Sequence, residues 1–356
     1  MRIEQIDVRN AAPQTYAALN AFLNETRAER LPDDPPVPLD EEIRRFQTIP
    51  TFIDLFAWIA EVDGAVVANP TVTVERAGHN AHLVEFNIAV REALRRQGLG
   101  TRLLERIGGT TAEIGRDLLI ASSQSTVPAG AEFLRRVGAR VGLESHTNQL
   151  ELRDLNRDLI RRWQERAAER AAGFDLLVWT AGPPDEFVEP FAALIGAMNR
   201  APRGTLQIED FHVTPEQLRE WQRSSRERGY ERWTIVAQER ATGRFAGFTE
   251  VSWHPNRPRL LSQEGTAVMA GFQNFGLGRW LKAAMLEKVL RERPGVERIR
   301  TGNADMNAPM LKINYELGFK PYISHYVWQV ELPQVRAYLD SVRATKLAGV
   351  GSSGAP

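Results

Sequence analysis

The sequence predicts an α/β protein with mixed sheets, built as two tandem copies of one domain. Three observations lead to this prediction. Segments with the alternating pattern of strands and segments with the spacing of amphipathic helices follow one another along the chain. A glycine-bearing loop between a strand and a helix occurs twice, and Val268 at the second loop lies 178 residues after Val90 at the first. Residues 138–152 and 318–332 correspond at an offset of 180.

Length and composition restrict the class of protein. A chain of 356 residues is too long for one ordinary core, so two domains are expected. Lys and Arg number 45, as do Asp and Glu, which argues against a nucleic-acid partner. No apolar segment approaches the roughly 20 residues of a membrane span. Without a signal segment or cysteine, a cytoplasmic protein is expected. The six histidines show no ligand spacing, so no metal is expected.

The first copy follows from its local patterns in chain order. Pro13 opens an amphipathic helix, a proline-rich loop follows, and Asp40 is expected to cap a short helix. Asp63-Gly64 is the turn of a hairpin. The expected strands are 1–8, 56–60, 65–74, 82–90, 118–122 and 148–152, and the expected helices after the loop are 101–116 and 129–137.

The second copy repeats this order after a polar segment, which is read as an exposed connecting helix that caps the first domain. Its expected strands are 176–180, 234–237, 245–253, 263–268, 298–302 and 326–332, and its expected helices begin at 183, 214, 279 and 308. The predicted boundaries are 1–153 for the first domain, 154–173 for the connecting helix, 174–342 for the second domain and 343–356 for a disordered tail.

Each glycine loop is a candidate anion site. The second reads Gln273-x-x-Gly276-x-Gly278, and the first has Arg95, Gly98 and Gly100 at the same spacing. The loop runs into a helix whose first backbone N–H groups have no intrahelical partner, so these groups and the helix dipole favour a phosphate. The pattern is neither a dinucleotide fingerprint nor a P-loop.

These motifs together resemble the GNAT superfamily of acyl-coenzyme A-dependent acyltransferases, and the duplication resembles the tandem subgroup that includes mycothiol synthase. The resemblance is most specific in the second half, which also has Asn307 and the ending Leu317-Gly318-Phe319. It implies two GNAT-type domains that bind acetyl-CoA as cosubstrate. The implied cofactor-binding residues are Val268, Met269, Ala270, Gln273, Asn274, Phe275, Gly276, Leu277, Gly278, Arg279 and Asn307 in the second copy, and Val90, Arg95, Arg96, Gln97, Gly98 and Gly100 in the first.

The second copy departs from the family at the position of the catalytic acid. Where the family has a tyrosine acid, this chain has Asn314, which has no proton to give. The candidate bases are Glu264, ranked first and expected to share its strand face with Thr266, then Glu250 and His254. Each is as well explained as a solvated residue at a strand edge.

The first copy has no counterpart to Asn307 and has Leu134 at the acid position, so a degenerate copy is expected there, with Glu85 as its base candidate. The main hypothesis is transfer of an acyl group, from acetyl-CoA, to a small-molecule amine by direct attack on the thioester. The alternatives are a non-catalytic coenzyme A-binding scaffold or sensor, or transfer to oxygen or sulfur. The acceptor stays open, as does the choice between monomer and homodimer.

Overall fold

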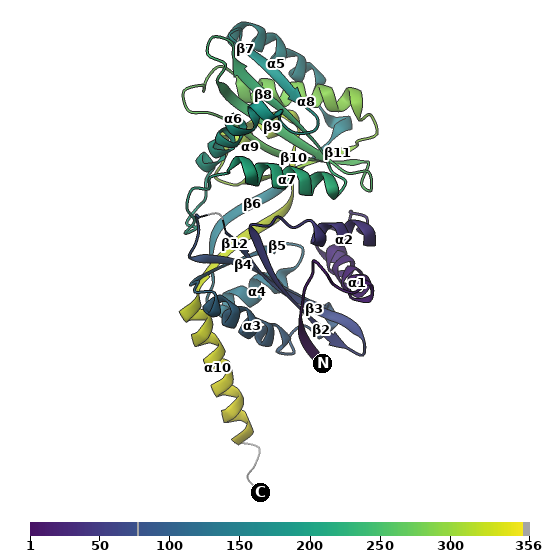
Figure 1. Cartoon of the computed structure of the whole chain (residues 1–356), viewed down its shortest axis with the longest axis vertical. Helices are drawn as coiled ribbons and strands as arrows, with labels where there is room; N and C mark the ends of the chain where they lie inside the picture. Colours follow the sequence, from purple (N-terminus) through teal and green to yellow (C-terminus); the bar gives the residue numbers. More distant parts are fainter. Residues whose placement is uncertain (77, 352–356) are drawn as a thin grey trace. The chain divides into compact units, whose positions relative to one another are not determined.

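The computed structural model describes residues 1–76 and 78–351, which form two compact units with mixed sheets flanked by helices (Figure 1). The first unit comprises Met1–Glu144, Gly204–Ile208 and the chain from His325 onward, and the second comprises Ser145–Arg203 and Glu209–Ser324. The predicted fold class is confirmed. Each unit has apolar clusters of its own and is described by itself below.

The first unit has a six-stranded sheet in the order β1-β2-β3-β4-β5-β12. Asp63 and Gly64 both have positive φ and form the predicted hairpin turn between β2 and β3. The strands are β1 (Arg2–Ile6), β2 (Ile53–Val62), β3 (Ala65–Glu75), β4 (Leu83–Val90), β5 (Leu118–Gln124) and β12 (Lys320–Glu331). The helices are α1 (Pro13–Arg30), α2 (Leu39–Gln47), α3 (Leu99–Glu113), α4 (Pro128–Val137) and α10 (Leu332–Gly351), with a 3₁₀ turn at Glu92–Leu94.

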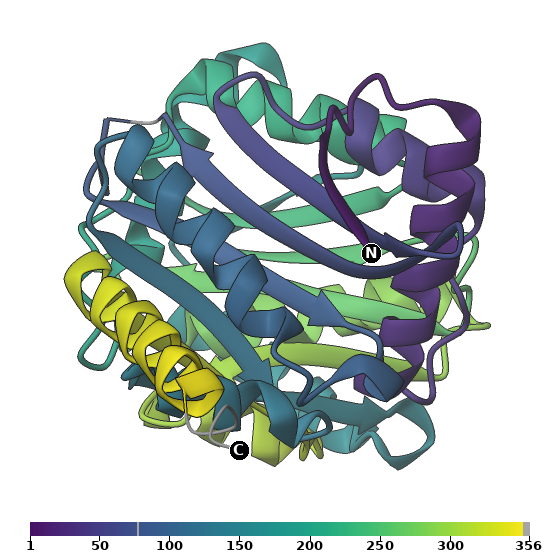
Figure 2. The same ribbon diagram turned by 90° about the horizontal axis from the view of Figure 1, so that it is seen from below.

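Alternation along the strands of this unit gives two apolar faces. Trp58 and Val72 face a cluster that includes Leu104 of α3 and Leu134 of α4. Ala57 and its neighbours face the opposite cluster, built with α1 and α2. Figure 2 shows α10, in yellow, beside the helices of the first face, to which it contributes buried apolar residues.

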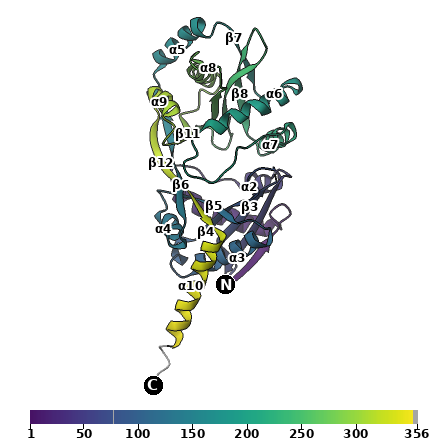
Figure 3. The same cartoon turned by 90° about the vertical axis from the view of Figure 1, so that its left-hand side faces the viewer.

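The second unit has the sheet order β6-β11-β10-β9-β8-β7. Its strands are β6 (Arg140–Glu151), β7 (Phe174–Trp179), β8 (Glu231–Glu239), β9 (Phe245–Trp253), β10 (Leu260–Val268) and β11 (Arg298–Ala304). Its helices are α5 (Arg157–Arg170), α6 (Val188–Ile195), α7 (Pro215–Glu227), α8 (Leu277–Glu292) and α9 (Ala308–Leu317), with 3₁₀ turns at Leu152–Asp154, Asp185–Phe187 and Gly196–Arg200. Figure 3 shows α5, α8 and α9 on one side of this sheet and α6 and α7 on the other.

Helix α5 differs from its predicted role. Ile160, Trp163 and Ala167 are buried in the core of the second unit, where α5 packs on α8. The helix therefore belongs to the second unit and does not cap the first. The polar composition of α5 did not predict this burial, because three apolar side chains at helical spacing are enough to form one buried stripe.

The predicted domain boundaries also differ from the compact units. The strand β5 pairs antiparallel with β12, and β11 pairs antiparallel with β6. Each copy thus completes its sheet with the closing strand of the other copy, so residues 145–151 join the second unit and 325–331 join the first. Local patterning does not distinguish the two closing strands, because they are equivalent segments of a repeat.

Two smaller expectations were wrong. The residue before the first turn of α2 is Pro38, and Asp40 lies inside the helix and pairs with Arg44. The predicted tail from residue 343 is helical as far as Gly351, and residues 352–356 lie outside the described residues. In the described part of the chain, no helix is long and apolar enough to cross a membrane.

Candidate functional site

The two glycine loops have the same backbone conformation. Arg96 and Asn274 have φ of 63° and 68°, and Gly98 and Gly276 have φ of 80° and 79°. Gly98 is the N-cap of α3 and Gly276 the N-cap of α8, and neither helix has a side-chain cap. The backbone N–H groups at each helix start therefore face outward, as an anion site requires. Glycine suits these positions because few side chains adopt this φ.

In both units the sheet opens beside the loop. The strands β4 and β5 pair only from Leu83–Leu118 to Glu85–Ile120, although both continue beyond these residues. The strands β10 and β11 pair only from Leu260–Arg298 to Ser262–Arg300. Past these points the two strands of each pair diverge. Their facing backbone groups are available to an extended ligand, which can add to an open strand edge.

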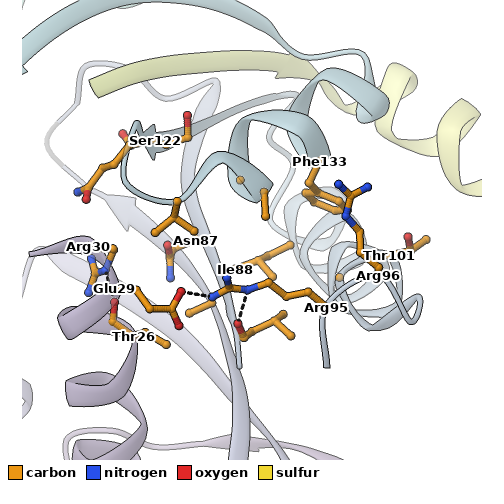
Figure 4. Close-up of a pocket in the computed structure, with 18 of the residues that line it drawn as sticks. Thr26, Glu29, Arg30, Asn87, Ile88, Arg95, Arg96, Thr101, Ser122 and Phe133 are labelled. Atoms are coloured by element: carbon orange, nitrogen blue, oxygen red, sulfur yellow. Dashed lines mark hydrogen bonds and ion pairs between the residues drawn. The ribbon is translucent and has the colours of Figure 1, made fainter. Parts of the chain in front are cut away.

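The first unit has a cavity of about 350 Å³ at this opening. It is lined by the end of α1, the open part of β4, the glycine loop, the start of α3, the end of β5 and α4 (Figure 4). Of the residues predicted in the first copy, Val90, Arg95, Arg96, Gly98 and Gly100 line the cavity. Gln97 does not, and its side chain donates to the Ala93 carbonyl.

Arg95 spans the cavity wall. Its Nε donates to the Val90 carbonyl over 2.9 Å, and its guanidinium forms an ion pair with Glu29 of α1 (Figure 4). Its neighbour Arg96 forms an ion pair with Glu132 of α4. The strand, the loop and two helices are thus linked around the cavity by charged groups.

Sequence reasoning missed the residues that α1 and the strands bring to this cavity. Thr26, Glu29 and Arg30 come from the last turn of α1, and Asn87 and Ser122 come from the diverging strands. The only local signal for α1 was its amphipathic spacing, which predicts a packed face. It does not say which part of the sheet that face meets.

In the second unit, the glycine loop and the helix start after it contact α5, α9 and β10. A Cβ at Gly278 would lie 3.7 Å from Ile313 and 3.9 Å from Val268, so α8 approaches β10 and α9 closely. Arg170 of α5 donates to the Asn274 carbonyl over 2.7 Å, and Phe275 contacts the ring of Phe174. The outer side of this loop is therefore held by neighbouring groups of the second unit.

Arg279 has partners within the second unit. Its backbone N–H donates to the Gly276 carbonyl over 3.1 Å. Its side chain pairs with Glu316 through two nitrogens and stacks over Trp163. Met269 also donates its N–H, to Ala246 of the neighbouring strand. Ala270 and Gln273 are exposed, Leu277 is buried, and Val268 is partly buried.

Glu264 does not share a face with Thr266 as predicted. A bulge between Gln263 and Thr266 shifts the register, and Gln263 donates to the hydroxyls of both Thr249 and Thr266. Glu264 instead accepts from the hydroxyl of Ser252 on the other face.

Glu250 lies near Glu264 and is nearly buried. Its carboxylate accepts from Thr234 over 2.8 Å and from Arg232 over 3.3 Å. Burial raises the pKa of the Glu250 carboxyl, and the Arg232 guanidinium offsets part of this effect. The charge of Glu264 raises the same pKa further. This arrangement can hold a proton on Glu250 more readily than on an exposed carboxyl.

The two asparagines of the second copy have structural partners. Asn314 is fully buried and donates to the Asn303 side chain over 2.7 Å. The side-chain oxygen of Asn307 accepts from the Met310 N–H over 3.4 Å, which makes Asn307 the N-cap of α9. His254 is buried, and its ring bonds to the backbone of Arg228 and Asn256. In the described residues, no group of three or more His, Cys, Asp or Glu side chains gathers as a metal site.

Residues 54–138 match the family model described as acetyltransferase (GNAT) domain. The matched segment lies in the first copy, although the motif spacings of the second copy are the more specific ones. No curated protein matches the chain.

Solved structures extend the likeness to both units. A tandem GNAT protein from the clavulanic acid biosynthesis pathway has a TM-score of 0.76 and 23% identity, over 93% of this chain and 99% of that one. A GCN5-related N-acetyltransferase from Sphaerobacter thermophilus has a TM-score of 0.62 and 14% identity, over 93% and 96%. The fold is therefore the tandem GNAT fold, as the resemblance predicted.

Proposed function

We propose that this protein transfers an acetyl group from acetyl-CoA to the amine of a small molecule. The observation that carries the proposal is the cavity of the GNAT domain, where an anion-binding loop and a diverging strand edge border one space. A thioester cosubstrate with a pyrophosphate and a polar arm fits both features.

The residues of the first unit have distinct parts in this proposal. The N–H groups after Gly98 hold the pyrophosphate, and the open edge of β4 as far as Val90 pairs with the pantetheine arm. When bound, the cosubstrate supplies an activated acyl group. Positioning of this group at the divergence of β4 and β5 brings it within reach of an amine. If the second unit is instead the one that holds the cosubstrate, Glu250 and Glu264 are its candidates for accepting the proton of an amine.

Which copy binds acetyl-CoA is tested by a matched set of variants. Gly98→Asp and Gly276→Asp each place a carboxylate in one candidate anion site. Gly98→Asn and Gly276→Asn add a side chain of the same size and shape that carries no charge. Asparagine tolerates the positive φ of both positions. We expect Gly98→Asp to weaken acetyl-CoA binding at least about tenfold relative to Gly98→Asn.

The second copy was expected to be the working site, and the same comparison at Gly276 tests this prediction. Binding is measured by calorimetry. If Gly98→Asp and Gly98→Asn bind alike, the first unit is not the cofactor site. If all four variants bind acetyl-CoA as the wild type does, neither loop is an anion site.

The reaction itself is tested by release of coenzyme A in the presence of a panel of amines, alcohols and thiols. The chain has no cysteine, so a thiol reagent reads the product without protein background. Release that depends on an amine supports the proposal. Tight binding with no release above hydrolysis by any acceptor would leave the scaffold or sensor alternative, and release with alcohols or thiols alone would indicate the O- or S-acyltransferase.

A further inference from the structure

The cavity of the first unit has a strongly unequal set of charges. Its lining residues include four arginines and a single acid, Glu29. Glu29 forms an ion pair with Arg95 and so offers no unpaired negative charge to a cationic amine. The charge pattern of the cavity therefore favours an anionic ligand group.

Arg30 is the arginine at the α1 end of this cavity. Its Nε donates to the Thr26 carbonyl over 3.2 Å, which holds the side chain against the last turn of the helix. Across the described residues, no acidic side chain forms an ion pair with Arg30. The remaining guanidinium N–H groups can therefore serve a ligand.

Two more arginines lie close to Arg30, and each forms an ion pair with an acidic side chain. Arg27 pairs with Asp34 over 3.0 Å, and Arg45 pairs with Glu42. Partial burial, together with the charges of Arg27 and Arg45, lowers the pKa of the Arg30 guanidinium. The group still carries its charge at neutral pH. An anion bound beside it would relieve this repulsion.

This positive end is separate from the anion site at the glycine loop. Figure 4 shows Arg30 and Thr26 on one side of the cavity and Arg96 and Thr101 on the other. Between them lie Asn87 of β4 and Ser122 of β5, both past the last paired residues of these strands. Asn87 and Ser122 are neutral hydrogen-bonding groups beside the opening of the sheet.

We propose that the acceptor is an amine that also bears a carboxylate, such as an amino acid, and that Arg30 binds this carboxylate. This inference rests on the acyltransferase function proposed above. The planar guanidinium donates two parallel hydrogen bonds to a carboxylate, which fixes the acceptor by one end. Its amine then lies toward Asn87 and Ser122, where the acyl group is positioned.

The test compares matched acceptors in the full-length enzyme. Each of a panel of amino acids is assayed against its own carboxamide and its decarboxylated amine, with release of coenzyme A as the readout. We expect the wild type to prefer the carboxylated member. Arg30→Gln is expected to remove the preference by raising KM for the acid about 30-fold, with kcat nearly unchanged. Arg30→Lys should retain part of it, because the charge remains without the bidentate geometry.

The control variant is Arg106→Gln, which removes the same charge from an exposed residue that does not line the cavity. It should keep the preference. Equal use of acids and carboxamides by the wild type would overturn this inference and leave the acyltransferase function intact. If no amine of any kind is acetylated, both proposals fail. If Arg30→Gln weakens acetyl-CoA binding while leaving the acceptor preference unchanged, Arg30 belongs to the cofactor site and the assignment is wrong.

Discussion

Lys282 offers a sharp test of packing in the second unit. It lies on α8 with only 2% of its surface exposed. Within the described residues, its amine forms no hydrogen bond or ion pair. The amine nitrogen lies over the ring of Phe319, 6.0 Å from the ring centre. The corresponding residue of the first copy is Leu104, which is fully buried. We therefore consider Lys282→Met, which keeps the length of the side chain, and Lys282→Leu, which restores the residue of the other copy.

The magnitude follows from the cost of charging a buried amine. Burial lowers the pKa of Lys282 from 10.5 to about 7. At about 1.4 kcal/mol per pH unit, the charged amine destabilises the folded protein by up to about 5 kcal/mol. The unfolded chain keeps the proton up to about pH 10.5 and the folded protein releases it above about pH 7. The wild type therefore gains stability from this group as pH rises across that window.

Lys282→Met lacks this gain. It should be more stable than the wild type at or below about pH 7, by up to about 5 kcal/mol, and the difference should shrink by about 1.4 kcal/mol for each pH unit above. The measurement is denaturant unfolding followed by tryptophan fluorescence, at pH values from about 6 to about 9. Titration of other groups cancels in the comparison of the two proteins.

Lys312→Met is the control, because it removes a lysine from the exposed side of α9. Its effect on the free energy of unfolding should stay within about 0.5 kcal/mol. A stability difference for Lys282→Met that is independent of pH would refute the reasoning. So would a variant less stable than the wild type at pH 7, since the amine would then have a partner that stabilises its charge.

Three further predictions concern the ends of helices. Gly318→Ala and Gly138→Ala should each destabilise the protein by about 1–2 kcal/mol in thermal or denaturant unfolding, because φ is 100° and 89° at these helix ends. An unchanged stability would contradict the left-handed conformation of these glycines. Thr214→Ala should cost about 1 kcal/mol by removing the capping box of α7, whereas Thr214→Ser should not. Asn307→Asp keeps the oxygen that caps α9 but removes the amide donor, so it should preserve stability and weaken acetyl-CoA binding if Asn307 also holds the cofactor. Unchanged binding of acetyl-CoA, measured by calorimetry, would leave the N-cap of α9 as the role of Asn307.

Much of the site was predictable because its parts are local. The glycine loop needs only a strand end, residues that accept a positive φ and an amphipathic helix, all within a dozen positions. Both copies carry these signals, and the two loops share one backbone conformation, with positive φ at Arg96, Gly98, Asn274 and Gly276. The hydrogen bond from the N–H of Arg279 to the Gly276 carbonyl was not predicted.

The strand faces were predictable only where alternation is unbroken. Glu264 was assigned to the face of Thr266 by the period of two, but the bulge after Gln263 inserts a residue and reverses the assignment. Gly265 is the local signal of this bulge, because an isolated glycine within a strand pattern often marks one. The bulge is stabilised by hydrogen bonds from the Gln263 side chain to the neighbouring strand, which form only when the sheet is assembled.

By itself, the sequence determined that the chain holds two copies of an α/β domain with a glycine-bearing loop before a helix in each, since turn chemistry and hydrophobic period are properties of short segments. Only the tertiary structure decided that β6 and β12 exchange between the copies. The two strands have the same pattern of apolar residues, so the sequence does not say which copy each one pairs with. The tertiary structure also decided that the last turn of α1 closes the cavity with Arg30. Contacts between segments far apart in the chain depend on how whole elements pack, and no local pattern records them.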